Sequence, residues 1–124
     1  MFANCTLDNV DINFPALTNG QNMFRNCGIT HINSINLPSL ENGAGMFAGC
    51  RLDRESALKV VGIASSVSSI TNYITMGVNN SLMNDASFRA ACNLPAQVPS
   101  YAATSGEMAY LDEAQTKAIG IFWT

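Results

Sequence analysis

Apolar residues return at fixed intervals along the first 52 residues of the chain. The segment Met1–Cys5 recurs as Met23–Cys27 and again as Met46–Cys50, so the copies are 22 and 23 residues apart. A second segment, Phe14–Gly20, is echoed by Leu37–Gly43. A period in the low twenties with apolar residues in phase is typical of a solenoid, in which successive coils stack and bury one another's apolar edge.

Each of the first two copies also predicts one short strand. Val10–Phe14 alternates apolar and polar residues, which is the pattern of a half-buried strand. Ile32–Leu37 has the same pattern with one extra residue, which predicts a bulge. Pro15 and Pro38 end the strands, because proline cannot donate to a ladder. We expect these strands to pair in parallel, and each Met-Phe-x-x-Cys segment to form a single helical or 3₁₀ turn.

The pattern changes after residue 52. Asp53 is a suitable N-cap for a helix, and residues 70–78 alternate toward their end as a strand does. A second helix is expected over residues 84–93, and a third from Asp112 to about Ala118. Residues 121–123 are expected to form a final strand or packing segment. A mixed helical and extended region of this kind is suited to covering the last coil of a solenoid.

The repeated segments resemble the BspA-like leucine-rich repeats of bacterial surface proteins and phage adhesion proteins. The matching features are Met-Phe-x-x-Cys followed by Leu or Ile, a short strand, Pro-x-Leu and Asn-Gly. The resemblance covers residues 1–52 and, more loosely, the helix beginning at Asp53 and the closing segment 111–123. The spacing Cys5-Thr6-Leu7 is one residue shorter than the usual pattern of the family.

This resemblance implies an α/β fold with two regions. Residues 1–52 would form a leucine-rich-repeat solenoid with a parallel sheet of one strand per repeat, and residues 53–124 an α+β C-terminal capping region. It also implies a binding or adhesion role, an extracellular, cell-surface or virion location, and no catalytic residues. Because Met1 occupies a repeat position, we expect further repeats upstream of it.

Composition narrows the class of partner. Hydrophobic residues make up 48% of the 124 positions, enough for one buried core, whereas charged residues make up only 12%. Fourteen Asn residues supply much of the polarity, and the net charge is −3. The six Lys and Arg residues are scattered, which argues against nucleic acid. No apolar run approaches the ~18 residues of a membrane span.

The cysteines leave several interpretations open. Cys5, Cys27 and Cys50 lie one repeat apart, and stacking would align them in a column. A zinc site would need a fourth ligand besides these thiols, and a disulfide between coils would need unusual rotamers. Small buried thiols are the favoured interpretation, also for Cys92 on a helix. Catalysis by His31 with a cysteine is disfavoured, because His31 occupies an outward strand position. We therefore expect no metal, no cofactor and no enzymatic activity.

Aromatic residues near the C-terminus suggest a second kind of surface. Tyr73, Tyr101, Tyr110 and Trp123 could together form a platform on which sugar rings stack. The favoured alternative for Trp123 is that it seals the core of the capping region. Residues 101–110 are the better candidates for exposed aromatic side chains, because they flank an irregular stretch.

Polar residues at outward strand positions are the predicted ligand face. Asn and Asp side chains suit hydrogen bonding to a glycan or a peptide backbone, so a host-surface protein or glycan is the expected partner. The alternative is a structural spacer or virion assembly part, which would self-associate through the first repeat at Met1 and Phe2. The residues of the predicted ligand face are Asn9, Asp11, Asn13, His31, Asn33, Ser34 and Asn36.

Overall fold

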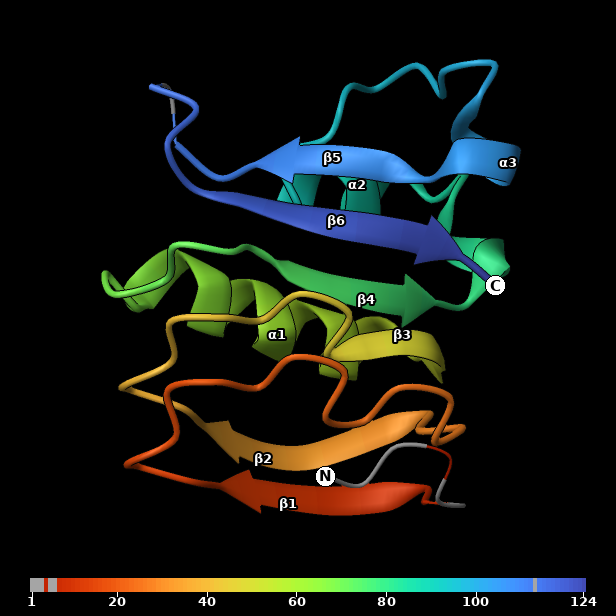
Figure 1. Cartoon of the computed structure of the whole chain (residues 1–124). Helices are drawn as coiled ribbons and strands as arrows, with labels where there is room; N and C mark the ends of the chain where they lie inside the picture. The colour runs from red at the N-terminus through yellow and green to blue at the C-terminus, as the bar shows by residue number, and fades with distance from the viewer. Residues whose placement is uncertain (1–3, 5–6, 113) are drawn as a thin grey trace.

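The computed structural model describes residues 4, 7–112 and 114–124, which contain six strands and three α-helices (Figure 1). The elements are β1 (Asn9–Asn13), β2 (His31–Asn36), β3 (Phe47–Leu52), α1 (Arg54–Ser66), β4 (Ile74–Val78), a 3₁₀ turn (Asn80–Leu82), α2 (Ala86–Ala91), α3 (Ala102–Ser105), β5 (Glu107–Tyr110) and β6 (Ala118–Trp123). The strands lie one above another in Figure 1, with β1 at one end and β5 at the other.

The strands of the described residues form two separate sheets. β1 and β2 pair in parallel, and the second sheet has the order β3-β4-β6-β5. Within it β3–β4 and β4–β6 are parallel, whereas β5 and β6 are antiparallel. The expected leucine-rich-repeat solenoid, with one parallel sheet carrying one strand per repeat, is therefore wrong. The chain is a small mixed α/β protein with a two-stranded and a four-stranded sheet.

The first sheet stops at β2 because α1 begins at the position where a further repeat would have placed a third strand. Ile32 of β2 lies five residues after Cys27, and the equivalent position after Cys50 is Glu55. Glu55 lies in the first turn of α1, whose N-cap is Asp53. The N-cap at Asp53 thus ends the repeat pattern, and the chain after the third copy forms a helix.

Side chains of α1 bind the edge of β2 that a third strand would have paired. Ser56 Oγ accepts a hydrogen bond from the Ile32 N–H at 2.7 Å. Lys59 Nζ donates to the carbonyl oxygens of Ile32, at 2.9 Å, and Asn33, at 3.0 Å. These bonds satisfy backbone groups that would otherwise be left without partners at the edge of the sheet.

The predicted strands of the first two copies and the bulge are confirmed. β1 and β2 lie within one residue of the predicted ranges at either end. Val10 pairs with Ile32, but Asp11 pairs with Ser34, so Asn33 is the extra residue of a bulge. The bulge lets both strands keep their apolar residues on the same side of the sheet.

The Met-Phe-x-x-Cys segments do not share one conformation. Turns occupy residues 21–26 in the second copy, where a helical or 3₁₀ turn was expected, and no helix is assigned there. The third copy becomes strand β3, so a single helical turn was wrong in that copy. The two copies still stack, because the rings of Phe24 and Phe47 are parallel to within 7° at a centroid distance of 5.5 Å. Met1, Phe2 and Cys5 of the first copy, including the proposed self-association surface, lie outside the described residues.

The two predicted helices that follow begin at aspartate caps. Asp53 Oδ1 accepts from the Ser56 N–H at 2.9 Å, which confirms the start of α1. Asp85 Oδ1 accepts from the Phe88 N–H at 3.0 Å at the start of α2, which is shorter than the predicted range 84–93. The apolar residues Phe88, Ala91 and Cys92 of this helix are predicted to be buried. Phe88 and Cys92 are buried, whereas Ala91 is exposed.

The third predicted helix is wrong. Asp112 Oδ1 accepts from the N–H groups of Thr116, at 2.8 Å, and Lys117, at 3.1 Å, but these bonds close the connection between β5 and β6. The antiparallel pairing of β5 with β6 leaves too little chain for a helix between them. The short helix α3 lies instead within residues 95–106, which Pro95, Pro99 and Gly106 predict to be irregular. The final strand over residues 121–123 is confirmed as part of β6.

A buried ion pair joins α2 to the second sheet. Arg89 and Glu107 are 1% and 7% exposed, and their bidentate bonds measure 2.7 and 2.8 Å. Arg89 also donates to the carbonyl oxygens of Met83 and Pro95, and Trp123 Nε1 donates to Glu107 Oε2 at 3.0 Å. Both charged groups are therefore buried with ion-pair and hydrogen-bond partners, which buried charges require.

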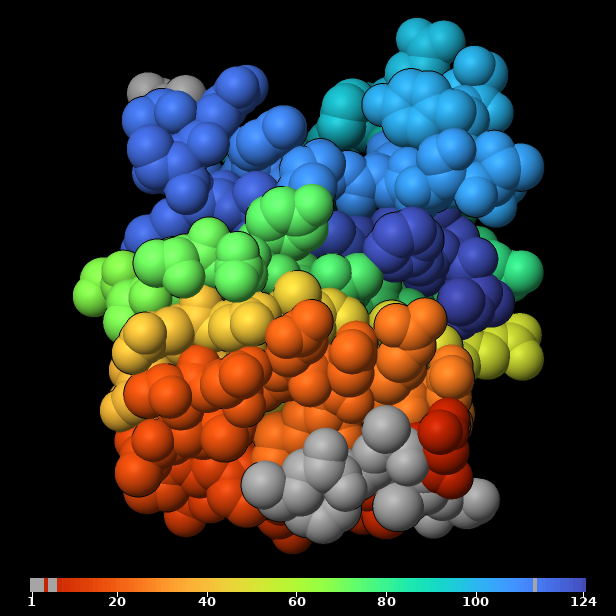
Figure 2. Space-filling view, in the orientation of Figure 1, coloured from red at the N-terminus to blue at the C-terminus, as the bar shows by residue number. Residues whose placement is uncertain are grey.

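The four-stranded sheet is covered by helices on one face only. In Figure 1, α1 and α2 lie behind it, and no helix crosses the front of β4, β6 and β5. Alternation in β6 follows this arrangement, because Ile119, Ile121 and Trp123 are buried toward the helices and Phe122 is exposed on the other side. We call the front of β4, β6 and β5 the open sheet face (Figure 2).

Candidate functional site

The predicted ligand residues lie on the two strands of the first sheet and are here called the polar strand face. Asn9, Asp11 and Asn13 alternate with the inward residues Val10 and Ile12 along β1, and all three are exposed. On β2, Asn33, Ser34 and Asn36 are exposed and His31 is half-buried. The outward orientation predicted from the alternation is therefore confirmed for β1, and on β2 it holds on both sides of the bulge.

Side chains of the polar strand face bond to one another across the sheet. Ser34 Oγ donates to Asp11 Oδ1 at 2.9 Å, and Asn36 Nδ2 donates to Asn13 Oδ1 at 3.0 Å. Each bond joins two residues that are paired in the backbone register. The bonds fix the orientation of the side chains and leave further lone pairs and amide hydrogens facing solvent.

His31 and Asn33 are held differently from the other five residues. His31 Nδ1 lies 3.0 Å from Asp53 Oδ2, so its ring is directed to the N-cap of α1. Asn33 is the bulge residue, and its carbonyl oxygen accepts from Lys59. The structure therefore joins Asp11 to Ser34 and Asn13 to Asn36 in two hydrogen-bonded pairs, whereas His31 and Asn33 contact α1 and its N-cap.

Asp53 links this surface to the stability of α1. Partial burial raises the pKa of its carboxyl, but hydrogen bonds from Ser56 and His31 lower it by more, and the net pKa lies below the ordinary value. A carboxyl with a lowered folded-state pKa contributes stability above its unfolded-state pKa. This contribution is lost as the pH falls through the folded-state pKa.

Asp53→Ala is expected to lower the free energy of unfolding by about 1 kcal/mol near pH 7, because the helix loses its N-cap. Between about pH 5 and pH 3 the variant is expected to lose less stability than the parent chain. Hydrogen bonds in its turn also lower the pKa of Asp112. The parent chain and the Asp53→Ala variant therefore both keep some loss of stability at low pH. Urea unfolding of the parent chain and the variant at about pH 5 and pH 3 measures the difference in acid sensitivity. Glu55→Gln, which changes an exposed acid, is the control. Equal acid sensitivity of variant and parent would contradict this role.

The described cysteines pack in the core. Cys27, Cys50 and Cys92 are free thiols and are buried. Burial raises the pKa of the Cys50 thiol and raises that of Cys92 to about 11, which keeps both protonated near neutral pH. No three side chains able to hold a metal ion lie together within the described ranges. These positions agree with the interpretation of the cysteines as small packing residues.

Several aromatic side chains in the second half of the chain are exposed, and the sequence only partly identified them. Tyr73, Tyr101, Tyr110 and Phe122 are exposed, whereas Trp123 is buried and bonded to Glu107, as expected of a core residue. Phe122 was not predicted, although it alternates with Ile121 and Trp123. The period of two in β6 was the signal that would have placed it on the solvent side.

A search for membrane-spanning helices and comparisons with other proteins give no further indication of function. Among the described helices, none has the length and apolar character needed to cross a bilayer. No protein-family model, no curated protein and no solved structure matches the chain.

Proposed function

We propose that the chain is a non-enzymatic recognition module that binds a host-surface protein or glycan through the polar strand face. The observation that carries this proposal is the set of cross-strand bonds Ser34–Asp11 and Asn36–Asn13 on exposed, register-paired positions. Such a module would act outside the cell, on a cell surface or on a virion.

The bonded side chains suit recognition because they are already ordered. Binding through a free Asn or Asp side chain costs rotamer entropy, which is smaller where a neighbour already holds the group. Asp11 and Asn13 keep acceptor capacity beyond the bonds they receive, and Asn36 keeps both a donor and an acceptor. Hydroxyl groups of a glycan and backbone amides of a protein can both complement such a row.

Binding of the intact chain to glycan arrays and to host-cell surfaces tests the proposal. Asp11→Ala and Asn36→Ala are each expected to weaken binding about three- to tenfold, since each removes one or two hydrogen bonds. Gln97→Ala, an exposed polar residue in the loop before α3, is the matched control and is expected to bind like the parent. Absence of binding to every surface, or equal binding by all three variants, would count against the polar strand face.

A further inference from the structure

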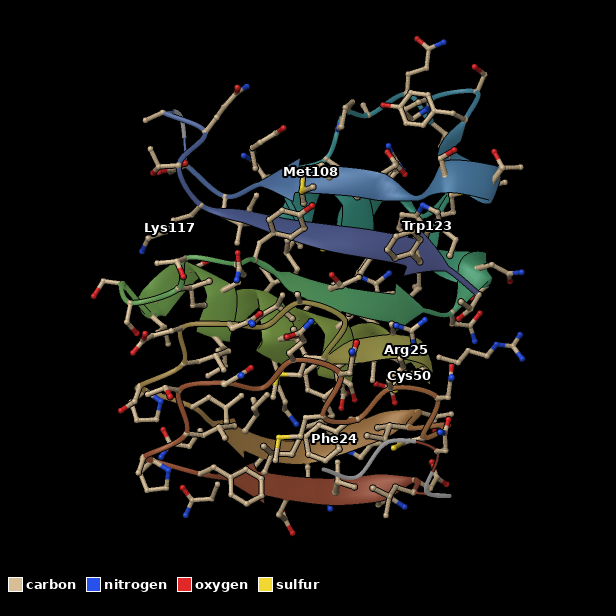
Figure 3. The ribbon with its side chains drawn as sticks, viewed as in Figure 1. Phe24, Arg25, Cys50, Met108, Lys117 and Trp123 are labelled. Atoms are coloured by element: carbon tan, nitrogen blue, oxygen red, sulfur yellow. The ribbon has the colours of Figure 1, made fainter. Side chains whose placement is uncertain are left out.

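The backbone register lines up a row of small and flexible side chains across the open sheet face. Thr75 of β4 pairs with Gly120 of β6, and Met108 of β5 pairs with Gly120 from the other side. The central position of the row thus carries no side chain. Figure 3 shows Met108 on this face, above β6. The row forms a floor across three strands, and neighbouring side chains, Tyr73 among them, cover its central glycine.

Aromatic side chains stand on both sides of this floor. Tyr110 pairs with Ala118, two residues before Gly120, and Tyr73 directly precedes β4 on the same side. Phe122 lies two residues after Gly120, or about 6.7 Å along the strand. Tyr73 and Phe122 are 46% and 44% exposed, so both rings retain accessible faces. Isolated exposed aromatics are common, but a set gathered on one uncovered sheet indicates a contact surface.

The Tyr73 ring lies against Gly120 and borders two hollows. A Cβ atom built on Gly120 would meet Tyr73 Cε2 at 3.4 Å and Thr75 Oγ1 at 3.8 Å. The first hollow, of about 240 Å³, lies on the open sheet face toward Phe122, whereas the second, of about 250 Å³, lies beyond the start of β4, between the end of α1 and Lys117. Both are smaller than the ~300–1,000 Å³ of sites for drug-sized ligands, so each admits a single small ring.

The polar groups that line the first hollow are mainly hydroxyls. Thr75 and Ser105 line it, and the carboxylate of Glu107, which borders it, is bonded to Arg89 and Trp123. In the second hollow, Lys117 donates to the Ser65 carbonyl oxygen at 2.6 Å and keeps its positive charge. Among the described residues that line the first hollow, a charged ligand would find no free counter-charge, whereas a ligand with several hydroxyl groups would find hydrogen-bonding partners.

We propose that the open sheet face binds one neutral pyranose ring of a glycan, with its apolar face on Tyr73 and its edge over Gly120. The C–H groups on one face of a pyranose carry slight positive charge and are attracted to the negative face of an aromatic ring. Its hydroxyl groups reach Thr75 and Ser105. The site lies on the second sheet and does not depend on the polar strand face.

Saturation-transfer NMR with neutral methyl glycopyranosides at millimolar concentration tests this site. We expect transfer to at least one neutral glycoside, with Gly120 and Thr75 amide resonances of the labelled chain shifting on titration. Tyr73→Ala and Gly120→Val are each expected to weaken binding about tenfold, the first by removing the stacking face and the second by filling the floor. Tyr101→Ala is the matched control, because Tyr101 is 56% exposed and lines neither hollow.

Each outcome of this experiment decides the proposal. Transfer to no glycoside, equal or stronger binding of methyl glucuronides, or loss of binding in Tyr101→Ala would overturn it. Amide shifts confined to β1 and β2 would also overturn it and would assign the sugar to the polar strand face. If Tyr73→Ala does not fold, Gly120→Val together with the amide shifts gives the same decision, since valine is favourable in strands.

Discussion

Arg89→Met is expected to lower the free energy of unfolding by about 3–5 kcal/mol, because it leaves the Glu107 carboxylate buried without its cation. Glu107 accepts two bonds from Arg89, at 2.7 and 2.8 Å, and would retain only the bond from Trp123. Arg89 also holds the carbonyl oxygens of Met83 and Pro95, so the loops on both sides of α2 lose their attachment to it. Equilibrium unfolding in urea measures the change.

The double variant Arg89→Met/Glu107→Leu separates charge burial from packing. It removes both charges and is expected to recover part of the loss, since apolar replacement of a buried pair is often tolerated. Recovery is incomplete because Trp123 Nε1 then lacks an acceptor, which costs about 1–3 kcal/mol. Glu55→Gln, at an exposed acid of α1, serves as the control. A loss below about 1 kcal/mol in Arg89→Met would show that the pair is accessible to water.

Phe47→Ala is expected to cost about 3–5 kcal/mol, the usual range for removing a buried phenylalanine. Phe47 is fully buried at the start of β3, and its ring stacks on Phe24 of the preceding copy. The cavity left in the variant would remove contacts between the turn of the second copy and the strand of the third. Phe122→Ala, at an exposed position, is the matched control and is expected to change stability by less than about 1 kcal/mol.

Urea midpoints of both phenylalanine variants provide the comparison. Similar losses in Phe47→Ala and Phe122→Ala would mean that the stacked pair contributes no more than a surface ring. Phe47→Leu adds a graded step, since it keeps most of the apolar volume and is expected to fall between the parent and Phe47→Ala.

Local signals predicted the elements that depend on local interactions. The alternation around Ile12, the extra residue near Asn33 and the cap at Asp53 each specify a structure over a few residues. These short-range preferences are satisfied by the same residues in the fold, so the strands β1 and β2, the bulge and the start of α1 could be predicted.

Long-range pairing could not be predicted in the same way. The repeat of Cys27 in Cys50 suggested the same short turn in both copies, but in the third copy this segment forms β3, which pairs with β4. Asp112 has the composition of a helix cap, but the pairing of β5 with β6 used its hydrogen bonds in a turn. In both places tertiary contacts decided between two locally acceptable conformations.

The same distinction between local and long-range information applies to the candidate sites. Outward positions such as Asp11 and Asn13 follow from the period of two, and the sequence placed them correctly. The cross-strand partners Ser34 and Asn36 needed the register, which the bulge shifts by one residue. The open sheet face depends on β5 lying beside β6, and no pattern within residues 107–123 indicates which strands are neighbours.

The position of β6 has a consequence for how the chain folds. β6 lies between β4 and β5 in the sheet, yet it follows both of them in the chain. During synthesis the apolar strand β4 emerges well before β6, which pairs with one of its edges. The chain between β4 and β6 must form a long loop, at a cost in entropy, before the two strands can pair in parallel. Assembly of the second sheet is therefore a late event. Until β6 is made, the free edge of β4 is the part of the molecule most exposed to pairing with other chains.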